Sequence, residues 1–194
     1  MSTSKFPGFD KIFSIYSSGS TREFIADIEL GNADSTNVLR GIETLKQAQA
    51  RWAMGGKKPG QFIFTRYVSV MMLGTDLLSS LQEAGISGWS TYPVELFGKQ
   101  GEPLGTYHGL IVHGRCGAMD DSRSVQTTKE FPGGVFPIWR GLYFDEGSWD
   151  GSDIFMPSDE TRWVFFTARA KRIFTACVKT VQFIALTDID GFDV

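Results

Sequence analysis

The sequence is poor in the residues that most often build catalytic and metal sites. Its 194 residues include two histidines and two cysteines. Two cysteines are too few for a disulfide framework, so we expect Cys116 and Cys177 to be reduced thiols. The sequence also lacks a glycine-rich phosphate-binding loop and the motifs G-x-S-x-G, H-E-x-x-H and C-x-x-C. These absences exclude the common hydrolase and redox signatures.

Long hydrophobic runs and an excess of positive charge are lacking as well. No run approaches the length of about 18 apolar residues that a membrane-spanning helix needs, and the first 13 residues contain no apolar signal-peptide core. The net charge is −3 and the isoelectric point about 5.4, whereas nucleic-acid-binding proteins normally present a basic face. We therefore expect a soluble, cytoplasmic protein with neither a nucleic-acid nor a membrane partner.

Aromatic residues, in contrast, are plentiful. The chain has 16 Phe, 5 Trp and 5 Tyr, and 42% of its residues are hydrophobic, which favours a sheet-rich core with aromatic packing. The length predicts a single domain over residues 1–194, with interlocked halves at 1–106 and 107–194 as the alternative. The expected fold class is α+β: a mixed sheet of about eight short strands with three or four helices.

Two segments repeat a strand–helix–strand pattern, which indicates two diverged copies of one unit. The later copy, Gly151–Asp188, has a strand at Trp163–Thr167, a helix at Ala168–Val178 and a strand at Val181–Leu186. The earlier copy, Gln61–Phe97, has a helix at Asp76–Ala84 and a strand at Trp89–Phe97. Phe62–Thr65 then corresponds to Val164–Thr167, and Tyr67–Gly74 is an insert.

Elsewhere the pattern predicts further strands and one long helix. Arg22–Leu30 alternates apolar and polar residues, as a strand with one covered face does. Ser35–Met54 carries an apolar stripe at helical spacing and is the longest predicted helix, despite the cost of Gly41 inside it. The remaining expectations are strands at Ile12–Tyr16, Tyr107–Arg115 and Val135–Phe144, the last an edge strand because of Pro137, an exposed connection at Cys116–Phe131, and a loose tail at Asp188–Val194.

Few side chains offer chemistry. His108 and His113 are five apart on one predicted strand, so they point to opposite faces and do not share a metal ion. His113 with Cys116 has the elements of a nucleophile pair or of half a zinc site, but further ligands at matching spacing are missing. Asp120 and Asp121 are either general acid–base groups or, as adjacent loop acids usually are, acceptors in a turn. Cys177 lies on an apolar stripe and is predicted to be core. No cofactor or metal is expected.

An acidic loop with aromatic residues is the strongest candidate for a binding surface. Residues 145–160 contain six acids and no Lys or Arg. Such a surface suits a basic protein partner, because charge speeds encounter and a buried aromatic supplies affinity. The alternative is a solvated loop whose Trp149 folds back on the core. The candidate partner-binding residues are Asp145, Glu146, Trp149, Asp150, Asp153, Asp159 and Glu160.

The later strand–helix–strand unit also resembles a known family. Its order GSDIF, polar loop, FFTARAKR and VQFIAL is similar to that of the Imm11-type immunity proteins, a domain of unknown function common in myxobacteria and belonging to polymorphic toxin systems. Thr167–Lys171 stands where that family often has Ser-Glu-Arg-Ala-Lys, so the Glu is absent. Tyr107–Ser124 resembles the family's middle segment, with its Asn replaced. The resemblance covers about Phe62 to Leu186.

The resemblance implies a non-enzymatic immunity protein, which binds a cognate bacterial toxin domain and blocks its active site. A toxin that acts on nucleic acid would offer the basic surface that an acidic loop recognises. Two other classes stay open. One is an enzyme of unfamiliar type that uses His108 or His113 with Asp120 or Asp121. The other is a structural or oligomerising module whose edge strands pair with a second copy.

Overall fold

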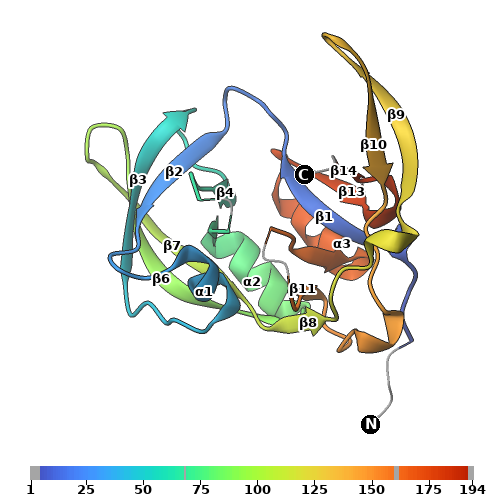
Figure 1. Cartoon of the computed structure of the whole chain (residues 1–194). Helices are drawn as coiled ribbons and strands as arrows, with labels where there is room; N and C mark the ends of the chain where they lie inside the picture. The colour runs from blue at the N-terminus through green and yellow to red at the C-terminus, as the bar shows by residue number, and fades with distance from the viewer. Residues whose placement is uncertain (1–4, 68, 160–161, 192–194) are drawn as a thin grey trace.

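The described part of the chain forms three sheets, a pair of central helices and a short third helix (Figure 1). The computed structural model describes residues 5–67, 69–159 and 162–191. Within these ranges it has fourteen strands and three α-helices, so the expected mixture of helix and sheet is confirmed but strands dominate. None of the helices in these ranges has the length and apolarity that crossing a membrane requires.

The largest sheet has six strands and nearly closes on itself. Its order is β2-β3-β6-β7-β5-β4, and an isolated bridge between Ala26 and Thr65 links the β2 end to the β4 end. Because the two ends meet, neither edge is left as a long open ladder. The strands are β2 (Phe24–Glu29), β3 (Ala48–Gly55), β6 (Trp89–Phe97), β7 (Pro103–Val112), β5 (Met71–Leu73) and β4 (Phe62–Phe64).

The second sheet has five strands and gathers both ends of the chain. Its order is β13-β1-β12-β11-β8. Strand β1 lies between two strands of the C-terminal unit and is antiparallel to both. The predicted division at residue 106 would cut β7 and separate β1 from its neighbours. The strands are β13 (Val181–Ala185), β1 (Ile12–Ser17), β12 (Phe165–Thr167), β11 (Ile154–Pro157) and β8 (Gly114–Cys116).

The two predicted strand–helix–strand units exist, but their match differs from the expected one. Helix α2 (Thr75–Glu83) joins β5 to β6 across β7, and α3 (Ala168–Cys177) joins β12 to β13 across β1. The counterpart of β12 is therefore β5, which lies inside the predicted insert Tyr67–Gly74, and Phe62–Thr65 forms the additional strand β4. The helices α2 and α3 pack against each other, so the two units meet through their helices.

The short strands alternate between two cores. In β12, Phe166 joins the central core with α2 and α3, whereas Phe165 joins the outer core of the five-stranded sheet. Strand β5 alternates in the same way, with Met71 in the central core and Met72 inside the six-stranded sheet. Because both faces of these strands are covered, their sequences are continuous runs of apolar residues.

The predicted helix Ser35–Met54 is wrong beyond its first turns. Helix α1 (Ser35–Arg40) begins at Asp34, whose carboxylate accepts from the N–H groups of Thr36 and Asn37, and it ends at Gly41 in the left-handed conformation at φ 72°. The chain then forms β3, which lies antiparallel to β2 and parallel to β6. Ladder bonds to two neighbouring strands outweigh the helical spacing of its apolar residues.

A third sheet, in the order β14-β10-β9, corrects the predictions for two segments. The expected connection Cys116–Phe131 contains β9 (Val125–Phe131), and β10 (Gly134–Arg140) ends before the predicted limit of Phe144. The tail is held as far as β14 (Asp190–Gly191), where Asp190 forms ion pairs with Lys129 and Arg140. Residues 192–194 lie outside the described ranges.

Candidate functional site

Two acidic segments that are distant in sequence lie against each other. The N–H of Asp120 donates to the carbonyl of Tyr143 at 2.8 Å, and the N–H of Gly117 donates to Ser148 Oγ at 2.7 Å. The N–H of Met119 donates to a carboxylate oxygen of Asp159 at 3.3 Å. We call the acidic residues of these two segments the acidic surface. It comprises Asp120, Asp121, Asp145, Glu146, Asp150 and Asp159, all exposed except the partly buried Asp120.

Most acids of the predicted loop also hold the backbone in place. Asp145 accepts from the N–H of Gly147 at 3.0 Å and caps a short 3₁₀ turn. Asp150 accepts from the N–H groups of Arg115 and Ser152, at 2.7 and 2.9 Å. Each carboxylate therefore fixes a turn, while its exposed position still leaves its charge at the surface. Glu160 lies outside the described residues.

Asp120 has the local role of an acceptor in a turn. The carboxylate of Asp120 accepts from the N–H and hydroxyl of Ser122 and caps the 3₁₀ turn Asp121–Arg123. Arg123 in this turn donates to the carbonyl of Phe144 and forms an ion pair with Glu146 at 3.4 Å. One exposed cation thus offsets part of the negative charge here.

Trp149 is folded back on the core. Its ring centroid is 5.7 Å from that of Phe6 and 5.9 Å from that of Phe155, and its indole N–H donates to the carbonyl of Ser152 at 3.1 Å. The side chain is only partly exposed. Trp149 therefore supports the loop from beneath and is not presented as an anchor for a partner.

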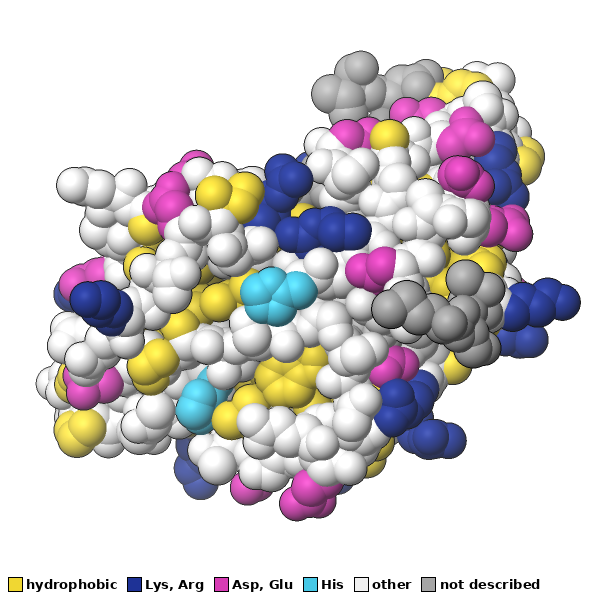
Figure 2. All heavy atoms as spheres, turned by 90° about the horizontal axis from the view of Figure 1, so that it is seen from below, with side chains coloured by type: hydrophobic (Ala, Val, Ile, Leu, Met, Phe, Trp, Pro, Cys, Tyr) yellow, Lys and Arg dark blue, Asp and Glu magenta, His cyan; other side chains and the backbone are white. Residues whose placement is uncertain are grey.

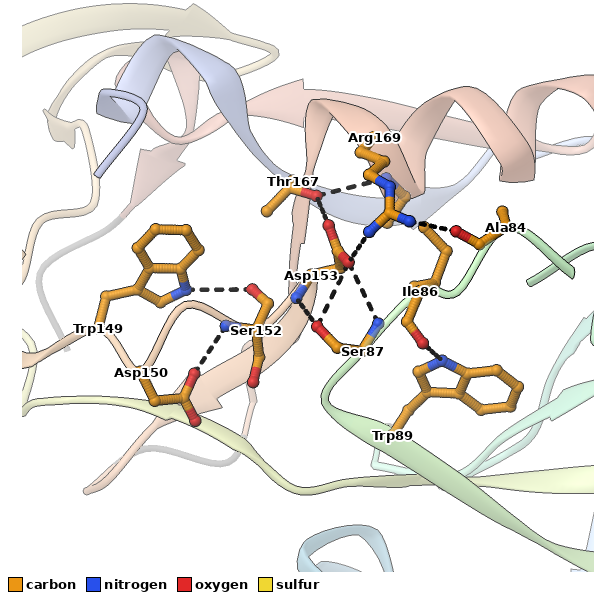
Figure 3. A network of polar contacts seen from close by, with 11 residues as sticks. Ala84, Ile86, Ser87, Trp89, Trp149, Asp150, Ser152, Asp153, Thr167 and Arg169 are labelled. Carbon is orange, nitrogen blue, oxygen red and sulfur yellow. Dashed lines mark hydrogen bonds and ion pairs between the residues drawn. The ribbon is translucent and has the colours of Figure 1, made fainter. Parts of the chain in front are cut away.

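Asp153 is buried within a network of polar contacts (Figure 3). It is 8% exposed. Its carboxylate accepts from Thr167 Oγ1 at 2.8 Å and from the N–H of Ser87 at 3.1 Å, and it pairs with Arg169 at 2.8 Å. Arg169 also donates to the carbonyl of Ala84, just after α2. This network ties the start of α3 to the loop that follows α2, so Asp153 joins the two strand–helix–strand units.

The histidines and cysteines are not assembled into a site. Figure 2 shows the two imidazoles apart on one face of the molecule. His113 lies 2.6 Å from Ser90 Oγ, and burial lowers the pKa of His108. Burial, followed by the charges of Asp150 and Asp159, raises the pKa of Cys116 to about 12, so its thiol stays protonated. Within the described ranges, His, Cys, Asp and Glu form no group of three that could hold a metal ion.

A cavity of about 420 Å³ opens where the two large sheets approach each other. Most of its lining is apolar. The sequence did not predict this cavity, because its lining comes from five separate segments of the chain. The lining residues are Ser14, Ile15, Tyr16, Ser17, Leu39, Phe64, Thr65, Tyr67, Met71, Arg162, Trp163 and Val164. The histidines and the Asp120–Asp121 pair, which the enzyme hypothesis requires in one pocket, are not among these described residues.

Sequence comparison leaves the chain without an assigned relative: no protein-family model and no curated protein matches it. The resemblance to Imm11-type immunity proteins therefore stays an expectation from the motifs.

Proposed function

We propose that this chain is a non-enzymatic immunity protein that binds a cognate toxin domain through the acidic surface. The observation that carries the proposal is the packing of residues 117–124 against residues 143–159, which brings acids from both segments near one another. The resemblance of Phe62–Leu186 to immunity proteins supports it. The partner would be a basic protein surface, such as the active-site face of a toxin that acts on nucleic acid.

The acidic surface would act mainly on the rate of encounter and on specificity. All its acidic residues except Asp120 are exposed, so water screens their carboxylates and each contributes little affinity alone. Together they attract a basic partner over a distance near the Debye length of about 8 Å at physiological salt. Because their hydrogen bonds fix the loops in advance, binding costs little ordering of the backbone.

The test uses the toxin domain encoded beside this gene. Purified wild-type chain should form a tight one-to-one complex with that domain and abolish its toxicity when the two are co-expressed. The double variant Asp121→Lys/Glu146→Lys reverses two charges of the acidic surface. It should slow association by about tenfold or more at low salt, and the difference should shrink as salt is added.

A matched control changes the net charge equally at a distant place. Glu29→Lys/Glu83→Lys reverses two exposed acids outside the acidic surface, and Glu29, like Glu146, belongs to an exposed ion pair with an arginine. This control should bind as the wild type does. If the wild type neither binds nor protects, the immunity function is wrong. If both double variants slow association equally, the toxin binds elsewhere.

A further inference from the structure

Strands β9 and β10 form a ribbon that extends away from the body of the protein (Figure 1). Strand β9 is the last strand of the order β14-β10-β9, so one of its edges faces no strand of the described chain. At seven residues it is longer than the other outermost strands β13 and β8, and the six-stranded sheet closes its own ends. The ribbon also carries three of the large hydrophobic side chains that are most exposed: Val125 at 62%, Val135 at 64% and Phe136 at 45%.

The register of the ribbon determines which backbone groups point outward. Phe131 pairs with Gly134 across the two-residue turn Pro132–Gly133, so these two residues form the hydrogen-bonded pair next to the turn. The odd-numbered residues of β9 therefore bond to β10, and the even-numbered residues direct their N–H and C=O groups to the open edge. Pro137 agrees with this assignment: it lies opposite Thr128, where β10 needs no N–H toward β9.

The open edge is complementary to itself. If two copies of β9 run antiparallel about an axis at Thr128, Gln126 lies opposite Glu130 and Thr128 lies opposite itself. These are the residues with outward backbone groups, and each such pair exchanges two hydrogen bonds. The opposed side chains also suit each other, because the Gln126 amide can donate to the Glu130 carboxylate. Like charges directly opposite each other would destabilise the pair, and this register places none there.

The other residues of β9 match in the same register. Val125 lies opposite Phe131 of the second copy, and Thr127 lies opposite Lys129. The Val125 side chain, largely exposed in one chain, would be covered by an aromatic ring. From this complementarity we infer that β9 is a homodimer interface, in which two copies join their three-stranded sheets into one six-stranded sheet. The inference does not depend on the proposed function.

Thr128 provides the decisive variants. Proline at position 128 removes an N–H that points to the open edge, so the ladder between β9 and β10 keeps its bonds. Lysine or glutamate at position 128 places two like charges at the axis. In sedimentation or light-scattering measurements over a concentration series, wild type should dimerise. Thr128→Pro, Thr128→Lys and Thr128→Glu should each weaken the dimer by about tenfold or more.

Mixing the two charged variants tests the axis itself. Equal amounts of Thr128→Lys and Thr128→Glu should form a heterodimer, because unlike charges then stand opposite each other. The control Thr106→Lys alters an exposed threonine of β7 and should dimerise as the wild type does. A strictly monomeric wild type, or a dimer that all three variants at position 128 leave unchanged, overturns the inference. Circular dichroism verifies that each variant is folded.

A cross-link establishes the register. Thr127 and Lys129 would be a non-hydrogen-bonded pair between copies, with Cα atoms about 4.5 Å apart, within the range of a disulfide. In a Cys177→Ser background, which removes the partly exposed thiol, a mixture of Thr127→Cys and Lys129→Cys chains should give a mixed disulfide faster than either chain alone. Equal rates for all three samples contradict the proposed register.

Discussion

Replacing Asp153 by alanine should destabilise the protein far more than removing any other acid of its loop. The carboxylate is 8% exposed and accepts hydrogen bonds from Thr167, Ser87 and Arg169 (Figure 3). Thr167 is also buried, and leaving its hydroxyl without an acceptor costs about 1–3 kcal/mol. The Ser87 N–H can reach water and contributes about 1 kcal/mol. The Arg169 side chain is 49% exposed, so its ion pair adds about 0.5–1 kcal/mol.

The expected total for Asp153→Ala is about 2.5–5 kcal/mol in the free energy of unfolding. Urea titration followed by tryptophan fluorescence measures it well, since the indole N–H groups of Trp89 and Trp149 bond to the carbonyls of Ile86 and Ser152, the residues just before Ser87 and Asp153. Arg169→Ala should cost only about 1 kcal/mol, because its charge is half-solvated and Asp153 keeps its other partners. Asp145→Ala, which removes an exposed acid with one backbone N–H to satisfy, should cost about 0.5 kcal/mol.

The order of the three variants is the most direct test: Asp153→Ala should cost the most, then Arg169→Ala, then Asp145→Ala. If Asp153→Ala lies within about 1 kcal/mol of the wild type, the carboxylate network does not join the two strand–helix–strand units. If Arg169→Ala costs as much as Asp153→Ala, the stabilisation comes from the arginine and its bond to the carbonyl of Ala84 instead.

The remaining predictions concern a buried tyrosine, the two cysteines and a glycine with positive φ. Tyr92→Phe should raise the free energy of unfolding by about 1 kcal/mol, because the Tyr92 hydroxyl is buried without a hydrogen-bond partner among the described residues. Burial raises the pKa of Tyr92 from 10.0 to about 12, so the unfolded chain loses this proton at a lower pH than the folded chain does. The free energy of unfolding of the wild type should therefore fall between pH 10 and about 12. The contribution of Tyr92 to this fall should be absent in Tyr92→Phe. A maleimide should label Cys177 and spare buried Cys116 in the native protein, as mass spectrometry would show; equal labelling would contradict the burial of Cys116. Gly41→Ala should cost more in a thermal melt than Gly31→Ala. Both glycines have positive φ, but a Cβ at Gly41 would lie 3.0 Å from a methyl group of Ile111 and a Cβ at Gly31 would meet nothing.

The sequence alone was a good guide wherever one periodicity dominated. The alternation of Phe24, Ala26 and Ile28 predicted β2, and helical spacing predicted α2 and α3, because each pattern records which residues of one element share a buried face. It failed in β3, where the apolar residues Ala48 and Trp52 fit a helical stripe as well as alternate places on a strand. Pairing with β2 and β6 decided between the two.

For polar residues, too, the sequence predicted some features and only the tertiary structure decided others. The composition of residues 145–160 predicted one acidic loop, but residues 154–157 of that stretch form the buried strand β11. However, counting charges could not distinguish the exposed Asp145 from Asp153, whose partner Ser87 lies 66 residues away. Strand β9 was expected to be a connection because its sequence is polar. Most of its residues are exposed in the structure, so its sequence lacks the alternation that marks a strand with one covered face. Local sequence patterns determine which face of a helix or strand is apolar and which is polar. Hydrogen bonds between distant segments decide which other elements contact that face, and only the tertiary structure contains those bonds.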